Sequence, residues 1–101
     1  MPITNSWHTL SGTEYMPAAL GVYELGNKNN EVVFIGRGSL SHRIGAHASA
    51  SASTCIGRNA TKFRYEQTAS HASRELELFA EFKETHRGKR PACNVHDPWR
   101  F

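Results

Sequence analysis

The sequence lacks several features that would place it in a specialised class of protein. No apolar run approaches the ~20 residues that a membrane-spanning helix needs. The first residues carry neither a basic stretch nor an apolar stretch of the kind that precedes secretory cleavage. No segment repeats another. These absences predict a cytoplasmic protein without a membrane partner.

Cysteine is scarce, with Cys55 and Cys93 far apart in the chain. Two cysteines are too few for a disulfide framework, and in a reducing compartment we expect free thiols. A zinc site would need closely paired Cys or His ligands, and His96 three residues after Cys93 is the one such pair that involves a cysteine. We therefore expect no zinc site.

The composition is that of one ordinary globular domain. The chain has 101 residues, of which 39% are hydrophobic and 21% charged, so it is neither disordered nor large enough for two domains. The formal net charge is +3. A basic balance permits a polyanionic partner such as nucleic acid but does not require one.

Local patterns predict two strands joined as a hairpin. Residues 20–25 alternate in polarity, and residues 31–36 are β-branched and apolar. The five residues between them are rich in Gly and Asn, which tolerate positive φ, so the strands should pair in antiparallel fashion. Gly36-Arg37-Gly38 is predicted to end the second strand, with Ser39 or Ser41 capping a helix.

The rest of the chain predicts a second helix and a third strand. Residues 48–53 form an Ala/Ser tract expected to be a loop, and residues 62–68 alternate as a strand. Residues 70–86 read as a long helix closed by Gly88. The predicted class is α+β, a small antiparallel sheet in ββαβα order flanked by helices. Residues 1–19 should form an arm packed on the domain, and residues 20–101 the single domain.

Several short motifs follow one another along most of the chain, from about residue 20 to residue 94. Arg43 comes seven residues after Gly36, and His47 comes four residues after Arg43, on one face of the predicted helix. The other motifs are Gly21-Val22-Tyr23, Phe34-Ile35-Gly36, Glu75 on the late helix and Arg90-Pro91-Ala92-Cys93-Asn94. Taken in their order along the chain, these motifs resemble those of the GIY-YIG nuclease family. The fold of that family has the same ββαβα order of elements that the local patterns predict here.

The resemblance implies an endonuclease that hydrolyses DNA phosphodiester bonds with a divalent cation, Mg²⁺ or Mn²⁺. Tyr23 would position or deprotonate the attacking water, and His47 would assist proton transfer. Arg43 would stabilise charge on the phosphate, because its guanidinium donates to phosphate oxygens in fixed geometry. Glu75 would hold the metal. A lone domain that must cut both strands would need a homodimer or two encounters with the DNA.

Phe34 stands where the family usually has its second tyrosine, and phenylalanine can neither accept a proton nor orient water. This favours a second hypothesis, a catalytically weak or inactive nucleic-acid-binding module that keeps the GIY-YIG fold. A third is a structural or protein-interaction domain. The resemblance gives Gly21 and Gly36 structural positions near the site, and Asn94 is expected to hydrogen-bond back to the core.

Basic side chains near the motifs are candidates for contacts with nucleic acid. Arg37 follows the second motif directly, and Lys62 and Arg64 lie on the third predicted strand. A solvated basic surface is the alternative interpretation for all three residues.

Helix periodicity separates the carboxylates of the late helix. At ~100° per residue, Glu75 falls in the middle of the apolar face beside Phe79 and Phe82, whereas Glu77 and Glu81 point to solvent. A carboxylate on a buried face is costly unless it is paired, hydrogen-bonded or bound to a cation. We therefore predict that Glu75 is the metal ligand, with a buried salt bridge or fraying of the helix start as the alternative.

Overall fold

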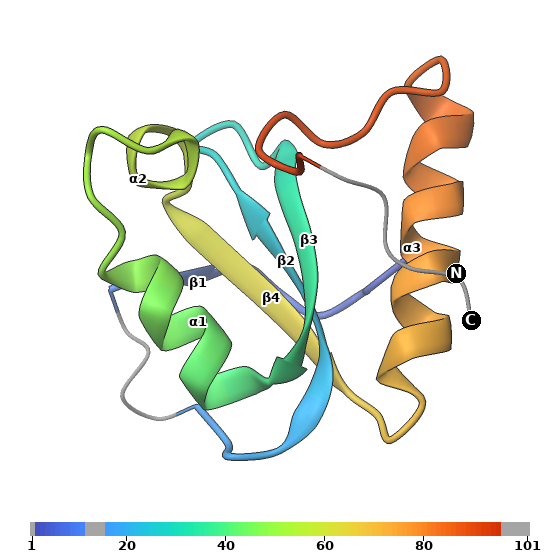
Figure 1. The fold of residues 1–101 in the computed structure, drawn as a ribbon, viewed down its shortest axis with the longest axis horizontal. Helices are drawn as coiled ribbons and strands as arrows, with labels where there is room; N and C mark the ends of the chain where they lie inside the picture. The colour runs from blue at the N-terminus through green and yellow to red at the C-terminus, as the bar shows by residue number, and fades with distance from the viewer. Residues whose placement is uncertain (1, 12–15, 96–101) are drawn as a thin grey trace.

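One four-stranded antiparallel sheet with helices on both faces forms the protein (Figure 1). The computed structural model describes residues 2–11 and 16–95, so residues 1, 12–15 and 96–101, parts of the predicted arm and domain, lie outside the described residues. The strand order is β1-β4-β2-β3. The elements are β1 (His8–Thr9), β2 (Leu20–Gly26), β3 (Val32–Ser39), α1 (Leu40–Ala48), α2 (Cys55–Asn59), β4 (Lys62–Gln67) and α3 (His71–Thr85). The predicted α+β class is confirmed.

The hairpin of β2 and β3 is confirmed, and its turn is held by a side chain. The Asn27 Oδ1 atom accepts hydrogen bonds from the backbone N–H groups of Asn29 and Glu31, at 2.9 and 3.0 Å. Asn30 has φ of 62°, a left-handed conformation that asparagine tolerates. The Asn-rich turn thus has the local chemistry that the sequence predicts.

The prediction that Gly36-Arg37-Gly38 ends the second strand is wrong, because β3 continues to Ser39. Pairing with β2 extends through this segment, with Gly36 opposite Tyr23 and Gly38 opposite Gly21. The backbone hydrogen bonds of this long pairing outweigh the weak strand propensity of two glycines. As a result α1 begins directly where β3 ends.

Alternation along the strands creates two cores. Tyr23 and Leu25 of β2 face α1 and join a cluster that includes Leu40 and Ile44 of that helix. The opposite face packs on α3, where another cluster contains Val22, Ile35, Leu78 and Phe79 together with Ile3 from the N-terminal segment. In Figure 1, α1 and α2 accordingly lie on one side of the sheet and α3 on the other.

The late helix agrees with its prediction except in one carboxylate. It spans His71–Thr85, and Gly88 beyond its end has φ of 78°. Glu77 is exposed, as predicted, but Glu81 is partly buried and does not point freely to solvent. Ile3 of the N-terminal segment packs with Leu78 and Phe79 of α3, and Pro2 and Glu24 line a hollow together with Glu81.

Two features of the fold carry little local signal. The helix α2 was not predicted; Thr54 caps it by accepting a hydrogen bond from the Gly57 N–H at 3.0 Å. The prediction of free thiols is wrong, because Cys55 and Cys93 form a disulfide across 38 residues. A disulfide also counts against the reducing compartment predicted from the sequence. Within the described residues, none of the helices combines the length and the apolar character that crossing a bilayer requires.

Candidate active site

Tyr23 and His47 form a hydrogen-bonded pair on the face of the sheet that packs against α1. The Tyr23 side chain is 2% exposed, and its hydroxyl lies 2.7 Å from His47 Nε2. The ring and hydroxyl of Tyr23 occupy the space where a side chain on Gly36 would project. Glycine at position 36 therefore lets the phenol reach the strand edge and the histidine of α1.

Helix α1 presents Arg43 toward the same place. Leu40 and Ile44 are fully buried and anchor one face of the helix to the sheet. Arg43 is exposed, and its side chain lies over Gly38, where a Cβ atom would come within 3.2 Å of the Arg43 Nε. Gly38 also has φ of 129°, a conformation that favours glycine. The absence of a side chain at Gly38 therefore leaves room for the Arg43 side chain at the end of β3.

Glu75 approaches from the opposite face of the sheet. Its side chain is 13% exposed, and its Oε1 atom accepts a charged hydrogen bond from Arg37 Nε at 3.0 Å. Arg37 Nη1 also lies 3.2 Å from His71 Nδ1 on the first turn of α3. The predicted position of Glu75 on the buried face agrees with this geometry, and the salt bridge foreseen as the alternative is present.

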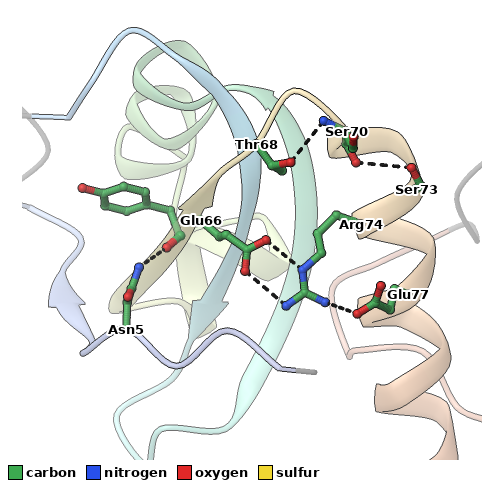
Figure 2. A network of polar contacts seen from close by, with 8 residues as sticks. Asn5, Glu66, Thr68, Ser70, Ser73, Arg74 and Glu77 are labelled. Carbon is green, nitrogen blue, oxygen red and sulfur yellow. Dashed lines mark hydrogen bonds and ion pairs between the residues drawn. The ribbon is translucent and has the colours of Figure 1, made fainter.

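A polar network on α3 is consistent with the helix rotation that the buried Leu78 and Phe79 set. Figure 2 shows Arg74 reaching from α3 to Glu66 of β4. The guanidinium donates to both carboxylate oxygens of Glu66, at 2.8 and 3.2 Å. The same guanidinium contacts Glu77 at 2.6 Å. Because Arg74 is held toward β4, the next residue along the helix is turned toward β3.

Tyr23, Arg43 and Glu75 line one cleft of about 350 Å³ at the β3 edge, whereas the predicted residue His47 contacts Tyr23 without being part of the lining. Other hollows of about 380–390 Å³ among the described residues do not contain this set of groups. The lining residues are Tyr23, Phe34, Ile35, Gly36, Arg37, Gly38, Arg43, Glu75, Phe79 and Asn94. A phenol, a guanidinium and a carboxylate from three different elements therefore meet around a small polar space.

The C-terminal segment of the described chain braces β3. Asn94 Oδ1 accepts from the Ile35 N–H at 2.9 Å, and Asn94 Nδ2 donates to the Ile35 carbonyl at 3.0 Å. The neighbouring Cys93 N–H donates to the Val33 carbonyl at 2.8 Å. The sequence predicted that Asn94 would hydrogen-bond back to the core, and these contacts do so within the lining of the cleft.

Burial shifts the pKa values of three ionisable groups in and beside the cleft. It raises the pKa of the Tyr23 phenol well above its ordinary value, although the nearby Arg43 charge opposes the shift. It lowers the pKa of His47, and the Arg43 charge adds to that effect. It also raises the pKa of Glu75, which Arg37 counteracts. At neutral pH the phenol is therefore protonated and the imidazole neutral, so the phenol donates to Nε2 when the imidazole carries its proton on Nδ1.

Phe34 lines the cleft beside this pair. Its ring centroid lies 4.9 Å from that of His47 and 6.1 Å from that of Tyr23. The ring packs against both partners and supplies no hydroxyl. Of these three rings, the phenol of Tyr23 and the imidazole of His47 are therefore the two that can exchange a proton.

The remaining predicted residues lie outside the cleft. Lys62 donates to Asn30 Oδ1 at 2.6 Å near the hairpin turn. Arg64 pairs with the buried Glu24 at 2.7 Å and stacks on Trp7, 4.3 Å from its centroid. Gly21 lies within β2, where a Cβ would strike the β4 backbone. Arg37 is the basic residue predicted to bind nucleic acid that the structure brings to Glu75.

Sequence reasoning missed the contribution of His71. It precedes Glu75 by one helical turn, so the two side chains lie on the same face of α3. That i, i+4 spacing was available in the sequence. Its partner Arg37 lies 34 residues away, however, and no local pattern connects the two.

The donors present suit a hydrated magnesium ion better than a metal held entirely by protein. Among residues 2–11 and 16–95, no three His, Cys, Asp or Glu side chains gather around a point. Magnesium usually keeps several waters and binds proteins through one or two carboxylates. Glu75, the carboxylate in the lining of this cleft, would suit that mode if a cation took the place of its Arg37 partner.

Comparison with known proteins gives a family and a fold. A family model described as "Domain of unknown function (DUF7508)" matches residues 1–85. The chain belongs to this family. Comparison with curated proteins finds no match.

Solved structures similar to this member of DUF7508 include two of the GIY-YIG N-terminal endonuclease domain of UvrC from Thermotoga maritima. Each is a Tyr-to-Phe point mutant bound to its catalytic divalent cation. Both have a TM-score of 0.56 and cover 83% of this chain and 91% of that chain, at 24% and 22% identity. At this identity the likeness establishes the fold, which is that of GIY-YIG endonuclease domains.

Proposed function

We propose that this protein is a divalent-metal-dependent endonuclease that hydrolyses DNA phosphodiester bonds. The observation that carries the proposal is the cleft at the β3 edge, where Tyr23, Arg43 and Glu75 converge from separate elements. The likeness to endonuclease domains that bind a catalytic divalent cation supports it. Phosphodiester hydrolysis needs a water activator, a stabiliser of phosphate charge and a metal-binding carboxylate, and the cleft has a candidate for each.

The Tyr23–His47 pair is suited to accept a proton from water without forming a stable phenolate. The neutral His47 Nε2 already lies 2.7 Å from the phenol oxygen. As water gives a proton to that oxygen, the phenol's own proton can pass to His47. The raised pKa of Tyr23 disfavours the free phenolate, so this relay is a lower-energy route to the nucleophile.

Arg43 is placed to hold the phosphate that is attacked. It is exposed at the mouth of the cleft, and its guanidinium can donate two parallel hydrogen bonds to non-bridging oxygens. These bonds strengthen as negative charge builds up on the phosphate. The position of Arg43 beside Tyr23 would orient the reacting phosphorus toward the activated water.

Glu75 is the residue proposed to hold the cation, Mg²⁺ or Mn²⁺. When bound, such a cation lowers the pKa of a coordinated water and neutralises charge on the phosphate. The partly buried carboxylate provides one fixed ligand in the cleft, on the opposite side from Arg43.

Nicking of supercoiled plasmid tests the proposal. We expect relaxed circles to form in Mg²⁺ or Mn²⁺ and not in EDTA, with DNA binding that weakens as salt increases. DNA binding without nicking in either metal, by protein shown to be folded, would contradict an endonuclease.

A DNA-binding module with little or no catalysis is the second candidate, and Phe34 is the observation that favours it. The residue lines the cleft where a hydroxyl could contact water. Phe34→Tyr tests this candidate, because the change adds a hydroxyl to a partly buried ring. Nicking that appears only in Phe34→Tyr would identify the native protein as the binding module, whereas nicking by both proteins supports the enzyme.

A further inference from the structure

Arg37 and Glu75 form a pair that metal binding must disturb. The two side chains meet at 3.0 Å, and Glu75 is 13% exposed while Arg37 is 37% exposed. A divalent cation bound by Glu75 would place two more positive charges within a few ångströms of the guanidinium. The cation and Arg37 therefore compete for one carboxylate.

Arg37 also serves the metal-free protein. A half-buried carboxylate without a counter-ion is unfavourable, and the charge and hydrogen bond of Arg37 offset the raised pKa that burial gives Glu75. The guanidinium makes a second contact at 3.2 Å with His71 Nδ1. That contact keeps the guanidinium beside the cleft even after Glu75 is taken by another cation.

A phosphate would give the released guanidinium a new partner. Arg37 lines the cleft with Arg43, and it is the more exposed member of its pair with Glu75. Arginine binds phosphate through two donors as readily as it binds carboxylate. A phosphodiester entering the cleft would therefore stabilise the arrangement in which Arg37 has left Glu75.

We propose that Arg37 is a positioning residue that pairs with Glu75 in the absence of metal and transfers to a substrate phosphate when a divalent cation binds. The cation and the phosphodiester then bind cooperatively, because each favours the same displaced arginine. By linkage, DNA must increase the affinity for the cation by the factor with which the cation increases the affinity for DNA. This inference rests on the proposed function.

The first test measures cation binding without DNA. Mn²⁺ is titrated into the protein at constant ionic strength, and unbound Mn²⁺ is counted by electron paramagnetic resonance. Arg37→Gln should bind Mn²⁺ about three- to tenfold more tightly than the native protein, because the competing charge is gone and the pair is partly exposed. Arg37→Lys, which keeps a charge in reach of Glu75, should stay close to native affinity.

Lys28→Gln is the matched control for the change of charge. Lys28 lies in the exposed turn between β2 and β3, several strand residues from Arg37. Its removal should alter Mn²⁺ affinity by less than about twofold, since exposed charges at that separation are largely screened. An equal gain in Lys28→Gln and Arg37→Gln would overturn the proposal in favour of a general effect of net charge.

The second test measures coupling in the native protein and needs no variant. The affinity for a labelled duplex with hydrolysis-resistant phosphorothioate linkages is measured by fluorescence polarisation, with and without Mn²⁺. Native protein should bind the duplex more tightly with Mn²⁺, and Arg37→Gln should lose most of that gain. Equal affinity in the two conditions for native protein would overturn the proposal even if Arg37→Gln failed to fold.

The outcomes separate this inference from the function on which it rests. If the native protein and Glu75→Gln bind Mn²⁺ equally, or neither binds it, the proposed metal site is wrong and the inference fails with it. If Glu75→Gln loses Mn²⁺ binding but Arg37→Gln binds no more tightly than native protein, the metal site stands and the role of Arg37 is refuted.

Discussion

Gly36→Ala should damage the cleft through a single methyl group. The added Cβ would overlap the ring and hydroxyl of Tyr23 and come within 2.9 Å of Phe34 Cε2. Tyr23 is 2% exposed and lies between β3 and α1, so it has little room to withdraw. Restoring normal contact requires the phenol to move by roughly 1 Å, which would stretch its 2.7 Å hydrogen bond to His47 beyond useful length.

The expected magnitudes follow from this displacement. Overpacking a well-filled core costs about 1–3 kcal/mol, which in a domain of this size lowers the melting temperature by roughly 4–8 °C per kcal/mol. A catalytic group misplaced by ~1 Å can reduce the rate by about 10²-fold. Gly36→Ala should therefore be less stable and nearly inactive under conditions where most molecules remain folded.

Gly45→Ala is the matched control on the adjacent helix. A Cβ at position 45 meets no atom within 4 Å, so the same substitution adds no overlap there. It should stabilise α1 by about 0.5–1 kcal/mol, because glycine is unfavourable inside a helix. Urea unfolding followed by circular dichroism, with plasmid nicking on the same samples, measures both effects. Native stability and rate in Gly36→Ala would refute the proposed packing of Tyr23.

Three further predictions concern the arginine, the proton acceptor and the disulfide. Arg43→Ala should change the free energy of unfolding by less than about 0.5 kcal/mol and lower the nicking rate by ~10²–10³, and full activity would remove Arg43 from the mechanism. Because neutral His47 is required and its pKa is lowered, activity should fall on acidification only below pH 6.5, the ordinary value; a midpoint above 6.5 would contradict the relay. Cys55→Ser should lower the free energy of unfolding by about 3–4 kcal/mol, since the disulfide closes a loop of 38 residues, and addition of a dithiol reductant to native protein should have the same effect. An unchanged urea midpoint in both cases would show that the bond does not form in solution.

The parts of the fold that can be predicted from the sequence are those determined by residues close together in the chain, such as turn residues and the spacing of apolar residues. The Asn-rich turn brings β2 and β3 together, and the spacing of Leu40 and Ile44 identifies the buried face of α1. The rotation of α3 follows from its apolar residues closely enough to place Glu75 toward the sheet. Each of these inferences uses residues within a few positions of one another, where geometry is almost independent of the rest of the chain.

The parts that escape prediction depend on partners distant in sequence. Strand β1 exists because His8 lies opposite Phe63, and two residues alone carry no strand pattern. The pairing of Cys55 with Cys93 and of Arg37 with Glu75 spans nearly 40 residues in each case. Alternation and helical period describe which face a residue occupies, but they do not say which distant residue shares that face.

Plasmid nicking by Glu75→Gln, compared with Glu77→Gln, tests the central claim most directly. Both substitutions remove one carboxylate charge from α3, but Glu75 lines the cleft and Glu77 is exposed beside Arg74. With both variants folded, Glu75→Gln should lose Mg²⁺- and Mn²⁺-dependent nicking, and Glu77→Gln should nick at close to the native rate. Metal-dependent nicking that persists in Glu75→Gln, or that is lost in Glu77→Gln instead, would contradict the assignment of the metal to Glu75.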